Sequence, residues 1–183
     1  TAQGPEGVGH VAAHQAAEHR RGHGEGRGGP HLIGYAGGGT GLDRLQGPGA
    51  VVRLDADGSV AVFESNANDL TTGDTNLEID VFRRDLTLGL TTRVSVDSSG
   101  LESNGPSIYA NLNSDGSRVV FHSIADALVA GDTNLTWDVF AHDVGTGITQ
   151  RVSVDNNGVE GDGASGVASL SSNGRFVVFA STS

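Results

Sequence analysis

Two short segments of the chain carry closely spaced acidic and amide side chains. Asp74, Asn76 and Asp80 occupy positions one, three and seven of a loop that is counted from Asp74, within a G-D-T-N-x-x-x-D segment. The same positions of a second such segment hold Asp132, Asn134 and Asp138. Carboxylate and amide oxygens at alternating positions of a loop are able to wrap around one Ca²⁺ ion. These residues are therefore the candidate metal ligands, and Ca²⁺ is the one cofactor that the sequence suggests.

The same spacing is also compatible with a structural role. Asp and Asn side chains accept hydrogen bonds from backbone N–H groups just beyond them and so stabilise long turns. The pattern differs from an EF-hand, because position six is not glycine and position twelve is not glutamate. Because the pattern recurs in both segments, a structural role in turn capping is favoured. Turn capping and calcium binding both stay open.

Aspartate and arginine recur at a fixed spacing as well. Arg93 follows Asp85 by eight residues, and Arg151 follows Asp143 by the same number. An ion pair between neighbouring strands is one interpretation, and an exposed pair of this kind contributes at most about 1 kcal/mol. The phenylalanines are expected to anchor the core, and they are Phe63, Phe82, Phe121, Phe140, Phe176 and Phe179.

No combination of nucleophile and base stands out. The chain has no cysteine, which excludes disulfides and thiolate chemistry, and it has no G-x-S-x-G motif. His122 and His142 replace Glu64 and Arg84 of the corresponding earlier segment, so neither belongs to a repeated motif. We therefore assign no catalytic residue; the sequence leaves enzyme activity open but points away from it.

These segments belong to a repeat with a period of 58 residues. LDADGSVAVFES at 54–65 returns as LNSDGSRVVFHS at 112–123 and as LSSNGRFVVFAS at 170–181. GDTNLEIDVFRRD at 73–85 and TTRVSVDSSG at 91–100 return at 131–143 and 149–158. About half of the aligned positions are identical between 46–103 and 104–161. Repetition on this scale predicts like-folded structural units.

Each unit has the pattern of antiparallel strands. Short β-branched runs alternate with turn dipeptides such as Asp57-Gly58 and Asn173-Gly174. In the first unit we predict strands near 48–55, 59–65, 79–86 and 91–97. Four strands per repeat predict the blade of a β-propeller. The expected fold is an all-β, incomplete propeller, with blades at 46–103 and 104–161 and half of a third blade at 162–183.

The first 45 residues have a different composition. They are rich in Gly, Ala and Arg and hold five of the seven histidines. With little apolar surface to bury, residues 1–45 are predicted to be a low-complexity or disordered segment, with at most a short helix over 11–21. Their first thirty residues contain no continuous apolar stretch, so no signal peptide is visible.

The net charge of −11 comes entirely from residues 46–183. An acidic surface of this kind disfavours phosphate backbones, so we expect no nucleic-acid partner. The sequence contains no apolar run long enough for a membrane-spanning helix.

Several of the repeated motifs resemble a known family. S-x-D-G-x-x-V-x-F-x-S, G-D-T-N-x-x-x-D-V-F-x-x-D and T-x-R-V-S-V are similar to the TolB-like, WD-type β-propeller repeats of bacterial secreted and periplasmic proteins. The resemblance covers residues 46–183 and implies a periplasmic or extracellular location. It says little about activity, because such blades occur in proteins of many functions.

The sequence therefore predicts a non-catalytic propeller module that serves as a binding or scaffolding surface. The alternative is the propeller part of a hydrolase or peptidase whose catalytic domain is absent from this chain. We expect its partner to be a protein or a glycan. Because closed propellers have at least four blades, we also expect association with further blades or with a second copy.

Overall fold

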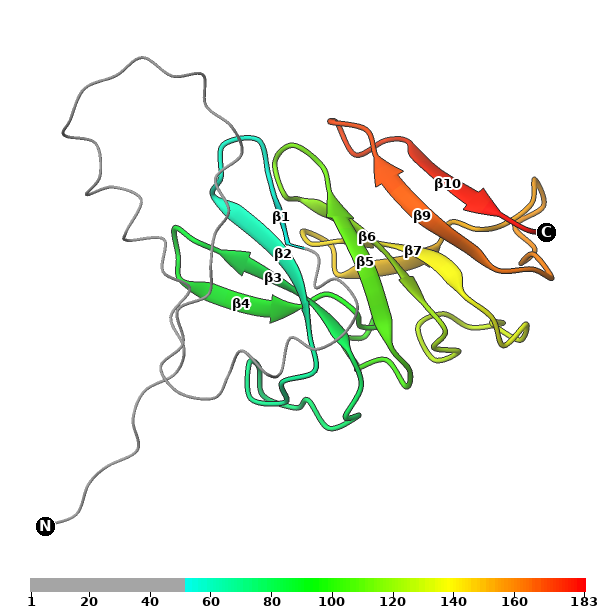
Figure 1. Cartoon of the computed structure of the whole chain (residues 1–183), viewed down its shortest axis with the longest axis horizontal. Coiled ribbons are helices and arrows are strands. Elements are labelled where there is room, and N and C mark those ends of the chain that lie inside the picture. Colours follow the sequence, from blue (N-terminus) through cyan, green and yellow to red (C-terminus); the bar gives the residue numbers. More distant parts are fainter. Residues whose placement is uncertain (1–51) are drawn as a thin grey trace, which may run out of the picture. The chain divides into compact units, whose positions relative to one another are not determined.

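A computed structural model describes residues 52–183, and their regular structure consists of β-strands (Figure 1). The strands are β1 (Arg53–Leu54), β2 (Val60–Ser65), β3 (Asp80–Asp85), β4 (Leu90–Arg93), β5 (Ser107–Leu112), β6 (Arg118–Ser123), β7 (Asp138–Asp143), β8 (Ile148–Arg151), β9 (Ser165–Leu170) and β10 (Val177–Ser181). They form the antiparallel sheets β1-β2-β3-β4, β5-β6-β7-β8 and β9-β10. The predicted incomplete propeller, with two four-stranded blades and half of a third, is confirmed. The segment 1–45 and its predicted helix lie outside the described residues.

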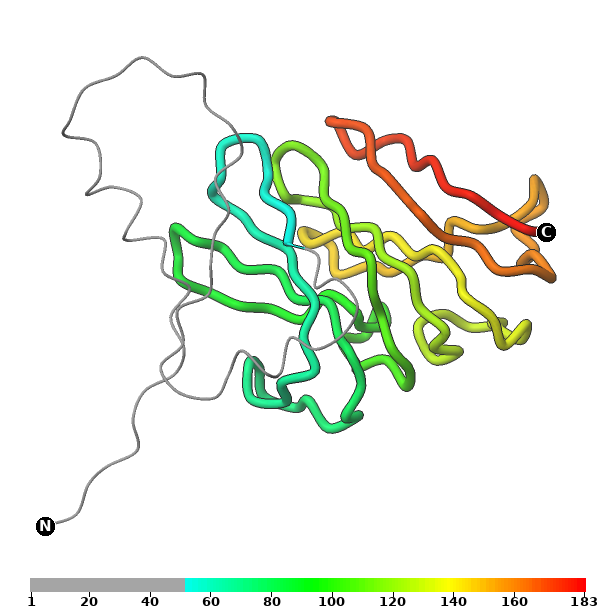
Figure 2. The backbone as a smooth tube through the Cα atoms, viewed as in Figure 1, coloured from blue at the N-terminus to red at the C-terminus, as the bar shows by residue number. Residues whose placement is uncertain are grey.

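The two complete sheets pair their strands in the same register. Phe63 of β2 lies opposite Phe82 of β3, and Phe121 of β6 lies opposite Phe140 of β7. The ring centroids are 5.7 Å apart in the first pair and 5.9 Å apart in the second. Figure 2 shows the same succession of hairpins in both blades. The sequence repeat is therefore a repeat of geometry.

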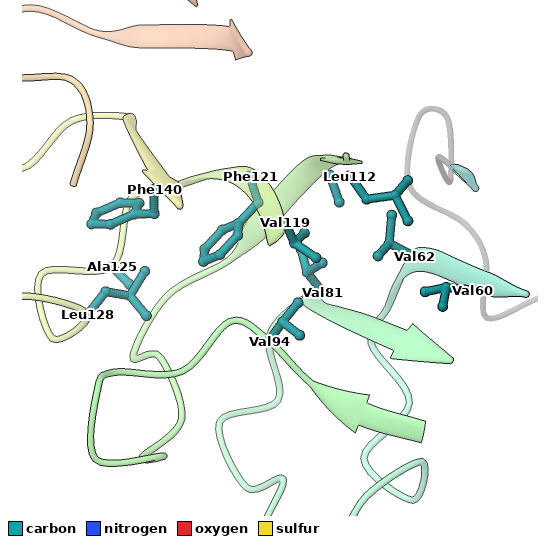
Figure 3. Close-up of a cluster of buried hydrophobic side chains, with 11 residues drawn as sticks. Val60, Val62, Val81, Val94, Leu112, Val119, Phe121, Ala125, Leu128 and Phe140 are labelled. Atoms are coloured by element: carbon teal, nitrogen blue, oxygen red, sulfur yellow. The ribbon is translucent and has the colours of Figure 1, made fainter. Parts of the chain in front are cut away.

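Apolar side chains between neighbouring sheets form the core (Figure 3). The cluster between the first two sheets consists of Val60, Val62, Val81, Val94, Ala110, Leu112, Val119, Phe121, Ala125, Leu128 and Phe140. A smaller cluster of Val120, Val139 and Ala168 joins the second sheet to the third. Because side chains alternate along a strand, β6 directs Val119 to the first sheet and Val120 to the third. The middle sheet is thus covered on both faces.

Hydrogen bonds also join each sheet to the next. The chain bulges in β5 and β9, where Tyr109 and Val167 have φ angles of 54° and 53°. The amide that follows each bulge turns to the preceding blade. Ala110 N donates to Glu64 Oε1 at 3.3 Å, and Ala168 N donates to His122 Nε2 at 3.0 Å.

The structure differs from the predictions in the length of two strands and in part of the core. The sequence predicts a strand over 91–97, but β4 ends at Arg93, because the chain turns at 97–101, where Asp97 N donates to Leu101 O and Gly100 N donates to Asp97 O. Of the predicted 48–55 strand, β1 covers Arg53–Leu54, while residues 48–51 lie outside the described part. The prediction that Phe176 and Phe179 anchor the core is also wrong, since both are exposed.

Candidate functional site

The acidic residues of the first blade that recur in the second surround an arginine. Arg93, the last residue of β4, places Nη1 3.2 Å from Asp74 Oδ1, 3.3 Å from Asp80 Oδ2 and 3.0 Å from Glu102 Oε2. Its Nη2 donates to the carbonyl oxygen of Gly73 at 2.8 Å. We call this group, Arg93 with Asp74, Asp80 and Glu102, the first cage. It ties the loop between β2 and β3 to the end of β4 and to the segment that leads into the next blade.

The second blade repeats the arrangement. Arg151 Nη1 lies 3.2 Å from Asp132 Oδ1, 3.6 Å from Asp138 Oδ2 and 2.5 Å from Glu160 Oε2, and Nη2 donates to Gly131 O at 3.0 Å. Arg151 with Asp132, Asp138 and Glu160 is the second cage. Two copies with matching partners indicate a constructed unit rather than a chance surface contact.

One aspartate of each cage, Asp80 or Asp138, also accepts hydrogen bonds from serine hydroxyls. Asp80 Oδ1 accepts hydrogen bonds from Ser95 Oγ at 2.5 Å and from Ser103 Oγ at 3.3 Å. In the second cage Ser153 Oγ donates to Asp138 Oδ1 at 2.5 Å. Both aspartates are completely buried, so these bonds and the guanidinium replace the water that each carboxylate has lost.

The asparagines have the capping role that was one of the two predictions. Asn76 Oδ1 accepts from Glu78 N at 2.9 Å, and Asn134 Oδ1 accepts from Thr136 N at 3.0 Å. The amide nitrogen of Asn76 donates to Asp80 Oδ2 and to Ser103 O. In each asparagine the side-chain carbonyl therefore caps the turn, and the NH₂ group donates to an aspartate of the cage.

Two cage residues were missed by the sequence reasoning. Glu102 and Glu160 lie outside the G-D-T-N segments, and each accepts hydrogen bonds from both the backbone N–H and the hydroxyl of a threonine, Thr75 or Thr133. The one signal that could have pointed to them is that both are glutamate at the 58-residue spacing. Nothing in the local spacing revealed that they approach the G-D-T-N loop.

The predicted pairing of Asp85 with Arg93, and of Asp143 with Arg151, is wrong. Strand register places Arg93 opposite Phe82 and Asp85 opposite Leu90, so the two side chains are far apart along the pair of strands. Asp85 Oδ1 instead accepts from the backbone N–H groups of residues 87 and 88. Asp143 pairs with Arg118 at 2.7 Å.

The electrostatics of the second cage are unbalanced, because three carboxylates share one guanidinium. Burial, opposed by Arg151 and reinforced by the neighbouring carboxylates, raises the pKa of Asp132 from 3.8 to about 6. Hydrogen bonds from Thr133 lower the pKa of Glu160. In the first cage burial likewise raises the pKa of Asp74, and hydrogen bonds from Thr75 lower that of Glu102. The second cage is therefore able to take up a proton at Asp132 in mildly acidic solution.

The geometry bears on the calcium interpretation. One oxygen from each of Asp132, Asp138 and Glu160 lies within 4.8 Å of the others, which is a spacing that a metal ion is able to bridge. Arg151 already provides the cation at this point. Calcium requires six to eight oxygen ligands, whereas the carbonyl of Asn134 is turned to the backbone of its own loop. The residues as arranged fit a guanidinium and do not fit a calcium ion unless Arg151 moves away.

A second polar group lies at the seam between the first two blades. His142 is buried beside a cavity of about 370 Å³ whose lining includes Val96, Ser98 and Val144. Thr149 Oγ1 donates to Val96 O at 2.5 Å, and because a carbonyl has no proton to give, the same hydroxyl accepts from His142 Nδ1 at 2.9 Å. Burial lowers the pKa of His142, so the ring is neutral with its proton on Nδ1.

Among the described residues there is no helix long and apolar enough to cross a membrane.

No protein-family model and no curated protein matches the sequence. Among solved structures the chain is similar to TolB from Acinetobacter baumannii, with 17% identity and a TM-score of 0.43 over 71% of this chain and 26% of that one. It is also similar to a putative TolB from Agrobacterium tumefaciens, with 17% identity and a TM-score of 0.48 over 70% of this chain and 36% of that one.

A third similar structure is the tricorn protease, with 10% identity and a TM-score of 0.44 over 71% of this chain and 10% of that one. The chain thus spans about a third or less of the length of each of these proteins. Two of these similar structures are TolB proteins, the family that the repeat motifs resemble. The similarity concerns the fold alone.

Proposed function

We propose that residues 46–183 act as a non-catalytic β-propeller module that supplies a scaffolding or binding surface. The observation that carries this proposal is that the polar side chains at repeated positions bond other parts of the protein. Both arginine cages connect loops within the protein, and Glu64 and His122 bond the backbone of the next blade. Polar side chains that are engaged in this way at equivalent positions of successive blades stabilise a platform. A periplasmic or extracellular location rests on the motif resemblance.

A scaffold role predicts that the blades unfold together. Calorimetry on the full chain should show one transition, and His122→Ala, which removes a bond between the second and third sheets, should broaden or split it. In parallel, the chain is incubated with p-nitrophenyl esters and with a peptide library. Hydrolysis that exceeds the heat-unfolded control and is lost in His142→Ala would contradict the non-catalytic role.

The alternative, a propeller that supports a hydrolase or peptidase domain, stays a prediction, since it concerns a domain outside this chain. Calcium is the other untested prediction. We favour the guanidinium as the cation of each cage, and titration calorimetry after chelation tests this preference. Binding heat together with a raised melting temperature would support calcium instead.

A further inference from the structure

A cavity of about 370 Å³ lies between the first two blades, both of which are complete. Its lining includes Val94, Val96 and Gly100 of the first blade and His142, Val144 and Gly147 of the second. Small-molecule sites have volumes of roughly 300–1,000 Å³ and are lined mostly by apolar groups with a few polar ones. The cavity therefore has the size and the lining of a site for a small ligand.

The cavity coincides with a departure from the repeat, the replacement of Arg84 by His142. In the first blade Arg84 Nη1 donates to Thr91 Oγ1 at 2.9 Å, and Arg84 Nη2 lies 3.7 Å from where a Cβ atom of Gly89 would be. In the second blade His142 makes the equivalent bond, also at 2.9 Å. A Cβ atom at Gly147, however, would have no heavy atom of the described chain within 4 Å beyond its chain neighbours. The histidine thus keeps the bond of the repeat, while its shorter side chain leaves room beside the hairpin.

The histidine offers one unused hydrogen-bond acceptor at this cavity. His142 is 6% exposed, and its Nδ1–H donates to Thr149 Oγ1, so Nε2 is the unprotonated nitrogen. Within residues 52–183 no group donates to Nε2. Unlike the buried and unpartnered Nε atoms of Arg93 and Arg151, this nitrogen keeps accessible surface. Because an unpaired acceptor in a buried position is unfavourable, a ligand that donates a hydrogen bond to it is favoured.

The neighbours of Nε2 restrict the chemistry of that ligand. An anion has no proton to donate to this nitrogen. A metal ion requires several ligands, and among the described residues that line the cavity His142 is the one imidazole and none carries a carboxylate. A cation would lie among valines and close to the guanidinium of Arg93, which also lines the cavity, so its burial is disfavoured. A neutral O–H group satisfies the acceptor without burying a charge.

We propose that this cavity binds a small neutral molecule with an apolar body and one hydroxyl group. The hydroxyl donates to His142 Nε2, and the apolar body packs against Val94, Val96 and Val144. This ligand site goes beyond the proposed scaffold role and does not depend on it.

Titration of the full chain with phenol and with toluene tests the proposal, because the two molecules have nearly the same size and phenol alone donates a hydrogen bond. In nitrogen-15 NMR spectra at pH 7, we expect phenol to shift the Nε2 signal of His142 in a saturable way. His122 is the internal control, since its Nε2 already accepts from Ala168 N at 3.0 Å and should not respond. His142→Phe keeps the size of the ring but removes its nitrogens, so the ratio of phenol affinity to toluene affinity should fall about threefold to tenfold.

His142→Arg provides a second variant that the chain itself suggests. It restores the residue of the first blade, where Arg84 bonds the equivalent threonine, so we expect it to fold. Its longer side chain should occupy the space beside Gly147 and abolish measurable binding of both phenol and toluene. This variant decides the question even if His142→Phe does not fold.

Three results would overturn the proposal. The first is the absence of a saturable shift at His142 Nε2 in millimolar phenol. The second is an equal shift at His122, or a ratio of the two affinities that is unchanged in His142→Phe. The third is undiminished phenol binding by His142→Arg. Each of them leaves the scaffold role intact, since that role is judged by the hydrolysis assay and by the single unfolding transition.

Discussion

Replacing the arginine of one cage should destabilise the protein far more than replacing an arginine on the surface. Arg151 is 8% exposed and lies among three carboxylates, of which Asp138 is buried. Removing one partner of a buried ionic group costs about 3–5 kcal/mol, because the remaining charges are left without compensation. We therefore expect Arg151→Ala to reduce the free energy of unfolding by about 3–5 kcal/mol.

Arg118 provides the matched control. It is also paired with an aspartate, Asp143, at 2.7 Å, but the two side chains are 40% and 29% exposed. Arg118→Ala should therefore cost at most about 1 kcal/mol. Urea denaturation at pH 7, followed by the fluorescence of Trp137, measures both variants. If the two arginine variants differ by less than about 1 kcal/mol, the cage is no more than a surface ion pair and the reasoning is refuted.

A second comparison separates charge from geometry. Arg151→Lys keeps the positive charge but loses the bond from Nη2 to the carbonyl oxygen of Gly131. It should fall between wild type and Arg151→Ala in stability. Adding Asp132→Asn to Arg151→Ala should recover part of the loss, because one uncompensated carboxylate is removed. Failure of the double variant to recover stability would show that repulsion among the acids is negligible.

Three further predictions concern titration and metal. Because the pKa of Asp132 rises from 3.8 to about 6 on folding, the folded state binds more protons between these values, and this residue reduces stability as pH increases from 4 to 6. Asp132→Asn should accordingly gain about 1–2 kcal/mol on wild type across that range, after allowance for solvent screening, and parallel stability curves would disprove it. Burial lowers the pKa of His122 and His142, so each ring stays neutral to a lower pH in the folded chain than in the unfolded one, and stability should decrease as pH falls below 6.5. The hydrogen bonds at Ala168 N and Thr149 Oγ1 place the proton of each neutral ring on Nδ1. Nitrogen-15 NMR spectra reveal the tautomers, and a proton on Nε2 of either ring would contradict the assignment. Chelator treatment should leave the melting temperature unchanged, whereas a decrease that Ca²⁺ restores would favour the metal.

The blade architecture could be predicted because it depends on local patterns that recur. Turn dipeptides and β-branched runs specify the hairpins, and repetition at 58 residues specifies that they recur in the same form. The capping role of Asn76 was also accessible, because it concerns a backbone amide two residues away. Local spacing is sufficient for contacts of this range.

The composition of the cages was beyond such reasoning. Glu102 is 27 residues from Thr75 and 9 residues from Arg93, and it reaches both through the turn at 97–100 that ends β4 early. Spacing in sequence favoured Asp85 as the partner of Arg93, since strand register was unknown. Register is decided by which apolar residues are buried on each face, and that depends on the neighbouring blade.

The position of the cages explains why the acidic residues of this chain recur so regularly. Glu102 and Glu160 lie at the start of the segment that enters the next blade. The strands that follow bond the preceding blade at their first residues, Ser107 N to Ile79 O and Ser165 N to Trp137 O, both at 2.7 Å. An arginine that holds this glutamate therefore fixes where the next blade begins relative to its own. Each cage thus acts at a joint between successive blades, and a substitution there should disturb the neighbouring blade as well as its own.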